Sequence, residues 1–321
     1  MKDKPQQYVL ITPARNEEEF IELTIRSMIA QTVRPLKWII VSDGSTDRTE
    51  EIARRYMGEH PWIELLRMPE RAERNFGGKV LCFKAGCDRV KNLEYDIIGN
   101  LDADLSFSND LFEFLMGKFA ANPRLGVGGA PFSEGQGTYD FRFSSVEHVS
   151  GACQLFRREC FEAIGGYTPI KGGGIDVVAV LTARMKGWET RTFPEKCLLH
   201  HRPMGTAGAG GLTARFKLGQ KDYALGRHLL WQTFRSFYQM TRRPFIVGGG
   251  ALLAGYLWAM LKRVERPVSR ELVHFQRREQ MQRVKRFLRK ASRPAGAAPS
   301  PAPAKRFAGN TSGDGPSTGT L

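Results

Sequence analysis

The first part of the chain alternates short apolar runs with segments of helical spacing. The apolar runs are short enough to be buried strands, which we predict at Tyr8–Thr12, Leu36–Ser42, Ile63–Leu66 and Tyr95–Leu101. The segments between and after them place apolar residues on one helical face, which predicts helices over Glu17–Ala30, from a cap at Asp47 to Met57, over Lys79–Val90 and over Leu111–Ala120. This alternation predicts an α/β fold with a mostly parallel, doubly wound sheet.

Polar loops that contain acids follow three of the predicted strands, at Pro13–Glu17, Asp43–Asp47 and Asp102–Asp104. Ligands of such sheets bind beyond the carboxyl ends of the strands, so we expect the chemistry in these loops. Asp102 and Asp104 are one residue apart, so their carboxylates can point the same way and hold Mg2+ or Mn2+, whose open positions nucleotide phosphates fill. Taken alone, this Asp-Ala-Asp sequence is more typical of a solvated loop.

With the three loops in this order and spacing, the chain resembles the family-2 glycosyltransferases over Tyr8 to Pro203. The resemblance implies the GT-A fold, a Rossmann-like, doubly wound mixed sheet, in a bacterial membrane-associated enzyme. It implies a nucleotide-sugar donor, UDP- or GDP-linked, held by Pro13, Ala14, Arg15, Glu17, Asp43, Lys79, Asp102 and Ala103. It also implies a divalent cation, Mg2+ or Mn2+, on Asp102 and Asp104, which neutralises charge on the departing nucleoside diphosphate.

Several of these donor-site residues have a second interpretation. Asp43 is also typical of a turn carboxylate in Asp-Gly-Ser, and Glu17 suits the positive end of a helix dipole. Arg15 and Lys79 are equally typical of surface residues that neutralise no phosphate.

The general base implied by the resemblance lies in the second half of the chain, at Asp176. Inversion at the sugar carbon needs a base that deprotonates the acceptor hydroxyl, and the family supplies an acid from a segment that matches Gly172–Ala179. The chain departs from the family pattern because Ile175 replaces the acid that often precedes the aspartate. The alternative role of Asp176 is an N-cap for a helix over Val177–Lys186.

His200 and His201 follow a strand-like segment over Thr192–Leu199. The resemblance implies that one of them completes the metal site, and imidazole beside carboxylates suits Mn2+. Neighbouring strand residues face opposite ways, so the sequence does not tell which histidine points inward. The alternative is a surface histidine pair, and Arg202, next along the chain, could contact the diphosphate.

The positive charge of the chain is concentrated near its C-terminal end. Between Arg215 and Arg293 there are 19 Lys+Arg and 4 Asp+Glu, so this stretch carries the whole formal net charge of +15. A neutral body with a basic end indicates an anionic surface as partner, either nucleic acid or a membrane. The membrane explains more, because an uncharged apolar run over 245–261 lies inside the basic stretch.

The run over 245–261 would reach ~25 Å as a helix, which is marginal against a ~30 Å hydrocarbon core. We therefore expect an interfacial or re-entrant segment, with a single span and then a buried soluble helix as alternatives. Amphipathic interfacial helices are predicted on either side, over Ala224–Met240 and Arg270–Lys290.

These patterns predict a transferase domain over 1–212, a basic helical membrane-associated region over 213–291 and a disordered tail over 292–321. A Gly-rich loop over 205–211 could be a lid or a linker. No signal peptide is recognisable, so we expect the catalytic part at the cytoplasmic face of the membrane. The five cysteines form no C-x-x-C pair, which is typical of reduced, structural thiols.

The sequence thus predicts a metal-dependent, inverting glycosyltransferase of cell-envelope or polysaccharide synthesis. Its partners would be a nucleotide-sugar, a lipid-linked or glycan acceptor and an anionic membrane surface, with no nucleic acid. One alternative is a nucleotidyltransferase on a similar fold, although the Gly-rich loop expected near its first strand is absent. The other is a catalytically degenerate, membrane-docked scaffold, which the residue at Ile175 favours.

Overall fold

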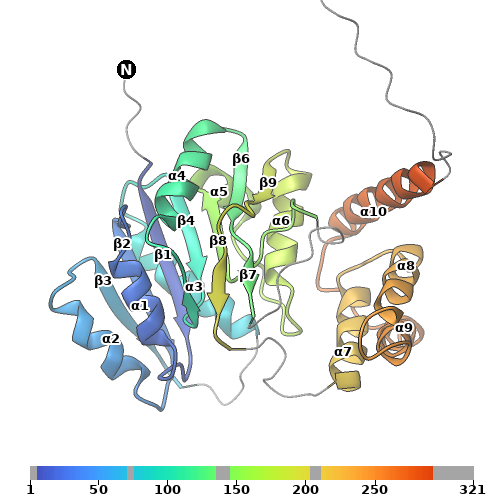
Figure 1. Cartoon of the computed structure of the whole chain (residues 1–321), viewed down its shortest axis with the longest axis horizontal. Coiled ribbons are helices and arrows are strands. Elements are labelled where there is room, and N and C mark those ends of the chain that lie inside the picture. The colour runs from blue at the N-terminus through green and yellow to red at the C-terminus, as the bar shows by residue number, and fades with distance from the viewer. Residues whose placement is uncertain (1–5, 71–75, 135–144, 203–210, 292–321) are drawn as a thin grey trace, which may run out of the picture. The chain divides into compact units, whose positions relative to one another are not determined.

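The structure is a computed structural model that describes residues 6–70, 76–134, 145–202 and 211–291. Its central sheet has seven strands in the order β3-β2-β1-β4-β8-β6-β9 (Figure 1). In chain order these are β1 (Tyr8–Ala14), β2 (Lys37–Asp43), β3 (Ile63–Met68), β4 (Ile97–Leu101), β6 (Leu125–Gly129), β8 (Cys153–Arg157) and β9 (Glu189–Thr192). β8 runs antiparallel to both of its neighbours and all other neighbours pair in parallel, so the predicted mixed sheet is confirmed.

Helices cover both faces of this sheet (Figure 1). Tyr8 and Leu10 of β1 join one hydrophobic cluster with α1 (Ile21–Ile29), α2 (Thr49–Met57) and α4 (Leu111–Ala121). Val9 and Ile11 join a second cluster with α3 (Phe76–Val90), α5 (Arg158–Ile164) and α6 (Ile175–Met185). Alternate residues of a strand face opposite sides, so an unbroken apolar strand such as β1 must be buried on both faces.

A second sheet joins three short strands in the order β5 (Leu105–Ser106), β10 (Leu198–His200) and β7 (Phe132–Ser133). His200 pairs with Leu105, the residue that follows Asp104. The expectation of a strand over Thr192–Leu199 is wrong for its middle, because β9 ends at Thr192 and β10 begins only at Leu198. Pro194 lies in this gap and has no N–H to donate to a strand ladder.

The basic region forms four helices, α7 (Gly211–Ala224), α8 (Leu229–Met240), α9 (Val247–Leu261) and α10 (Arg270–Ala291). The helix predicted from Ala224 is wrong at its start. Gly226, with φ of +80°, lies in the turn that separates α7 from α8. His228 caps α8, because its Nδ1 accepts the N–H of Leu230 at 3.1 Å. Among the helices of the described residues, none has both the length and the apolarity that crossing a membrane would require.

Contacts divide the chain into two units, Met1–Met281 and Gln282–Leu321, and α10 runs across the division. The boundary after residue 212 stays a prediction. The tail over 292–321 and most of the Gly-rich loop over 205–211 lie outside the described residues.

α7 and α9 pack with their backbones in close approach, and Gly255 makes this possible. A Cβ at Gly255 would lie 2.0 Å from the carbonyl oxygen of Phe216 in α7. Gly250, in the same helix, has nothing within 4 Å of the equivalent position. Alanine substitutions at these two glycines therefore distinguish the packing effect of an added methyl group from its effect on helix propensity.

We expect Gly255→Ala to lower the free energy of unfolding by about 1–3 kcal/mol, because the backbone of α7 has to move. The control, Gly250→Ala, should raise it by up to about 1 kcal/mol, since Ala is the better helix former. Urea denaturation followed by circular dichroism measures both. Equal effects of the two substitutions would contradict this packing.

Candidate active site

The strand ends that carry the polar loops meet at one edge of the sheet. β1 lies between β2 and β4 and pairs with both in parallel, so the loops after Ala14, Asp43 and Leu101 leave the sheet on the same side. The strand regions predicted from the sequence therefore bring the three loops together.

Asp102, Asp104 and His200 form a group whose ligand atoms all lie within 4.8 Å of one another. Nε2 of His200 lies 3.4 Å from Oδ1 of Asp104. Ala103, between the two acids, is buried in the core, which leaves the flanking carboxylates at the site. Two carboxylates and one imidazole are a donor set that suits Mn2+ or Mg2+, so these residues fit the cation implied by the resemblance.

Pairing of β10 with β5 decides which histidine reaches the acids. The N–H of His201 donates to the carbonyl oxygen of Asp104 at 2.9 Å, and this holds the two segments in register. The His201 ring turns away, with Nε2 2.9 Å from Oγ of Ser106 and a stacked contact to Phe20 at 5.9 Å between ring centroids. Of the two histidines, His200 lies with the carboxylates.

The position of Asp104 favours a positive partner. Burial raises the pKa of the Asp104 carboxyl, and the charge of Asp102 raises it further. His200 and Arg202 act in the opposite direction. A cation bound between the two acids would relieve the repulsion that raises this pKa.

Asp102 is held by a lysine and an amide. Nζ of Lys79, in the first turns of α3, lies 2.5 Å from Oδ1 of Asp102. Nδ2 of Asn100 donates to the same oxygen at 3.0 Å and to the carbonyl oxygen of Gly151. Asn100 was not predicted as a site residue, although it is a polar residue in the apolar run that precedes Asp102.

Asp176 lies at the start of α6 and faces the same hollow as Asp102. A pocket of about 130 Å³ is lined by residues of both halves of the chain, among them Lys79, Asp102, Asp176 and His200. Oδ2 of Asp176 accepts the N–H of Gly151 at 3.3 Å, and its side chain caps no helix. The N-cap interpretation of Asp176 is therefore wrong.

The first two loops form a neighbouring group of charged residues. Nη1 of Arg15 lies 3.8 Å from Oδ2 of the buried Asp43. Glu17 is also buried, and its two carboxylate oxygens accept from the guanidinium of Arg202 at 3.0 and 2.7 Å. Pro13 and Ala14 are the last residues of β1. Arg202 thus ties the first loop to the segment after His200, a link that sequence spacing could not reveal.

Two further charged residues lie near the site and were not predicted from the sequence. Glu134 lies 3.5 Å from Nδ1 of His200, on the side of the ring away from Asp104. Lys221 of α7 lies within electrostatic range of Asp176: burial lowers the pKa of Lys221, and the carboxylates of Asp222 and Asp176 oppose this shift. No motif in the sequence connects either residue to the predicted site.

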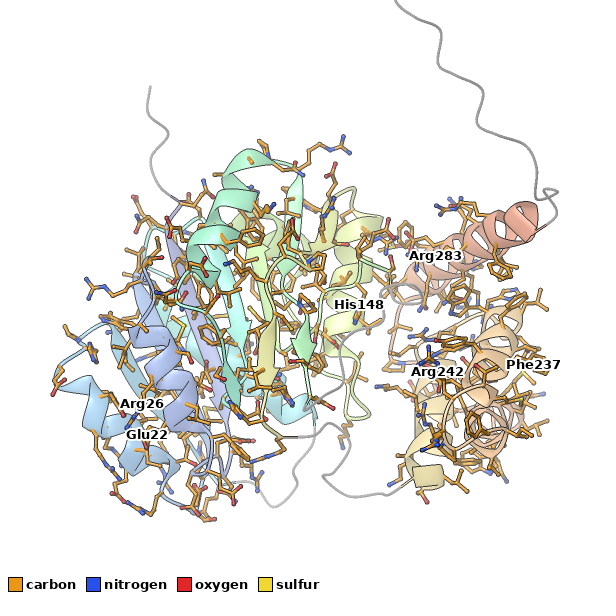
Figure 2. All side chains as sticks on the ribbon, in the orientation of Figure 1. Glu22, Arg26, His148, Phe237, Arg242 and Arg283 are labelled. Carbon is orange, nitrogen blue, oxygen red and sulfur yellow. The ribbon has the colours of Figure 1, made fainter. Side chains whose placement is uncertain are left out.

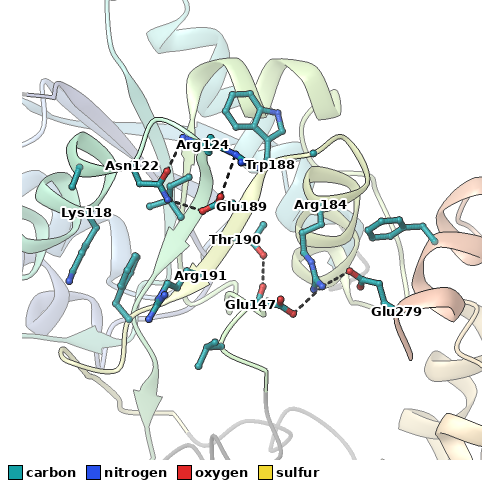
Figure 3. A pocket seen from close by; sticks show the side chains of 16 residues that line it. Lys118, Asn122, Arg124, Glu147, Arg184, Trp188, Glu189, Thr190, Arg191 and Glu279 are labelled. Carbon is teal, nitrogen blue, oxygen red and sulfur yellow. Dashed lines mark hydrogen bonds and ion pairs between the residues drawn. The ribbon is translucent and has the colours of Figure 1, made fainter. Parts of the chain in front are cut away.

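A larger cavity, of about 660 Å³, lies elsewhere and contains none of these acids (Figure 3). Its charged groups pair with one another, as Arg184 does with Glu147 at 3.0 Å and Arg124 with Glu189 at 3.4 Å. Size alone therefore does not identify the chemical site. The smaller pocket holds the carboxylates, the lysine and the histidine.

The family model described as glycosyl transferase family 2 matches residues 9–169, half of the chain. The chain belongs to glycosyltransferase family 2. Its curated relatives include the dolichyl-phosphate beta-glucosyltransferase ALG5A of Trichomonas vaginalis, 34% identical over 118 residues that make up 33% of each chain. A poly-beta-1,6-N-acetyl-D-glucosamine synthase of Staphylococcus aureus is 26% identical over 149 residues, 46% of this chain and 34% of that one. The chain thus spans about a third of the length of these relatives.

Solved structures of glycosyltransferases share the fold. The mannosyltransferase PcManGT of Pyrobaculum calidifontis, in complex with GDP-Man and Mn2+, has a TM-score of 0.53 and 18% identity, with 91% of this chain and 82% of that one covered. S. aureus TarS 1-349 has a TM-score of 0.52 and 12% identity, with coverage of 80% and 72%. The mixed sheet and its helices therefore have the GT-A fold that the sequence predicted.

The geometry predicts different effects of replacing the two histidines. Mn2+ should stabilise the protein by about 2.7 kcal/mol when its concentration is 100-fold above its dissociation constant. His200→Asn removes a proposed metal ligand and should weaken Mn2+ binding by about tenfold or more, because loss of even an outer-shell partner costs roughly tenfold in affinity. The matched control His201→Asn should change it little, because that ring faces Ser106. Thermal unfolding over a Mn2+ titration measures both, and equal losses would refute the role of His200.

Proposed function

We propose that the protein is a metal-dependent, inverting glycosyltransferase that moves a sugar from a nucleotide-sugar to an acceptor hydroxyl. The observation that carries the proposal is that Asp102, His200 and Asp176 line one pocket. A donor diphosphate bound at the first two residues would place its sugar carbon near the third. Membership of glycosyltransferase family 2 supports this reaction class.

In this proposal the donor lies along the edge of the sheet. Asp43 and the first loop, from Pro13 to Glu17, receive the nucleoside, and Lys79 and Arg202 lie where they can neutralise phosphate. Both carboxylate oxygens of Glu17 accept hydrogen bonds from Arg202. The main role proposed for Glu17 is therefore to orient that arginine, and binding of the ribose is secondary. Asp102, Asp104 and His200 would hold Mg2+ or Mn2+, which when bound supplies Lewis-acid stabilisation of the leaving diphosphate.

Asp176 is the proposed general base. Its Oδ2 is oriented by the N–H of Gly151, and that hydrogen bond holds the carboxylate over the pocket. Lys221 of α7 lies within electrostatic range of Asp176. The neighbouring Ile175 is buried in the core, so packing explains why this residue is apolar. Its apolar side chain does not argue against Asp176 as the base.

The acceptor proposed for this site is a lipid-linked sugar or a growing glycan of the cell envelope, met at the cytoplasmic face of an anionic membrane. The names of the relatives support it, since one is a dolichyl-phosphate glucosyltransferase and another a polysaccharide synthase. PcManGT, solved with GDP-Man and Mn2+, and TarS, solved with UDP-GlcNAc, support a GDP- or UDP-linked donor.

The test is turnover of a panel of UDP- and GDP-sugars with Mn2+. Asp176→Asn should reduce kcat by about 10²–10⁴-fold, the usual contribution of a general base, and should keep donor binding. Asp104→Asn should weaken both turnover and Mn2+-dependent donor binding. Asp88→Asn, at an exposed aspartate of α3, is the control and should change neither.

Unchanged turnover in Asp176→Asn would remove Asp176 from the role of base. If the wild-type protein binds a donor and neither transfers nor hydrolyses it with any acceptor tried, the degenerate scaffold is the better account.

A further inference from the structure

α8 has its polar side chains inside and its apolar side chains outside. Gln232 and Ser236, one turn apart, are completely buried. Leu230, Phe234 and Phe237 share the opposite side at spacings of four and three residues, and Leu230 and Phe237 are 57% and 61% exposed. A surface helix in water normally has the reverse arrangement, with its apolar stripe toward the core.

The buried side of α8 is fixed by its contacts. The carbonyl oxygen of Ser236 and the side chain of Met240 lie against Gly249 of α9, so closely that a Cβ there would meet the oxygen at 2.2 Å. Arg235 of α8 forms an ion pair with the fully buried Asp222 of α7, which Arg227 also contacts at 2.9 Å. α8 therefore cannot turn its apolar side inward without breaking a buried ion pair and a close backbone contact.

Exposed apolar side chains also follow α8 in the sequence. Phe245 and Ile246, just before α9, and Val247, its first residue, are all exposed, Ile246 to 71%. We call Leu230, Phe234, Phe237 and Phe245–Val247 the apolar face. Exposed apolar groups of this number mark an interaction surface more often than a water-facing one.

Basic side chains accompany the apolar face. Arg242 and Arg243 are exposed and lie between its two parts in the sequence, and Figure 2 labels Arg242 and Phe237 at separate places in this helical region. Lys262 and Arg263 are exposed at the other end of α9. The stretch 215–293, in which these residues lie, contains 19 Lys+Arg and 4 Asp+Glu and is therefore strongly basic. A second copy of the same surface would be repelled, whereas anionic lipid headgroups would be attracted.

Insertion of the whole segment 245–261 into a bilayer does not fit the packing of α9. Leu252, Tyr256 and Ala259 are buried, and the Tyr256 hydroxyl donates to the carbonyl oxygen of Arg227 at 2.7 Å. Within α9, Val247 at the N-terminal end belongs to the apolar face, and Trp258 and Leu261 near the other end are exposed as well. Docking through this face leaves the helices packed, while a re-entrant or spanning helix would separate α9 from α7 and α8.

We propose that the apolar face docks peripherally into one leaflet of an anionic bilayer, with Leu230, Phe237 and Ile246 among the acyl chains and Arg242 and Arg243 at the headgroups. One consequence of this docking rests on the proposed function: the surface would bring the transferase site to a lipid-linked acceptor. The docking itself requires no transfer activity.

The experiment is co-sedimentation of the full chain with vesicles of phosphatidylcholine alone or with phosphatidylglycerol added. We expect binding only to the anionic vesicles. The double variant Leu230→Ser/Phe237→Ser should reduce the partition coefficient by about tenfold or more, because two apolar side chains no longer leave water. Leu23→Ser, at an exposed leucine of α1, is the matched control and should bind like wild type. Arg242→Gln/Arg243→Gln should weaken binding most at low salt.

Wild-type binding by the double variant would overturn the proposal. So would a wild-type chain that binds no vesicle and forms a dimer by light scattering that the double variant loses, since the face would then join two copies. Donor hydrolysis, measured on the same samples without lipid, reports on the proposed function separately: active variants that no longer bind vesicles support docking, and inactive protein that still binds contradicts only the enzymatic proposal.

Discussion

Parallel pairing of β1 with β2 on one side and β4 on the other is the constraint on which the site depends. It brings the ends of three strands to one edge, so loops that are far apart in sequence face a common space. The short β5–β10 pairing adds the second half of the chain, because it sets His200 opposite Leu105 and so beside Asp104. Each charged group is then held by a neighbour: Asp102 by Lys79, Glu17 by Arg202 and Asp176 by the Gly151 N–H. The site is thus a consequence of backbone pairing.

The N-terminal half of the fold could be predicted because its strands are continuous apolar runs and its helices have clear apolar faces. The loops after Ala14, Asp43 and Leu101 could be chosen as the site for the same reason, since a parallel sheet fixes which ends of its strands meet. The choice between His200 and His201 could not be made, because it depends on the register of β10 against β5. Glu134 and Lys221 could not be found, because tertiary packing alone brings them near the site.

Near the C-terminal end, composition indicated the kind of partner, but it did not predict where the helices begin or which of their residues are buried. The basic excess, the apolar run over 245–261 and the amphipathic pattern over 224–240 predicted a membrane partner, and the apolar face proposed above lies within these two segments. The sequence did not show which of their residues are buried. Hydropathy averaged along α9 does not show that Leu252 and Tyr256 are buried against other helices, or that α8 exposes Leu230 and Phe237. The turn at Gly226, which lies between α7 and α8, was likewise not predicted from the sequence. The sequence of α8 does not tell which of its two sides faces the protein, because that depends on how the helix packs.

We propose that the Asp102–Asp104–His200 group and Asp176 serve one reaction in one pocket. Anomalous scattering from a crystal grown with Mn2+ and a nucleotide-sugar is the decisive measurement. We expect a manganese peak within coordination distance of Asp104 and Nε2 of His200, with the donor diphosphate on the open side of the ion and the sugar directed toward Asp176. A manganese peak on other residues, or a donor sugar that points away from Asp176, would contradict it.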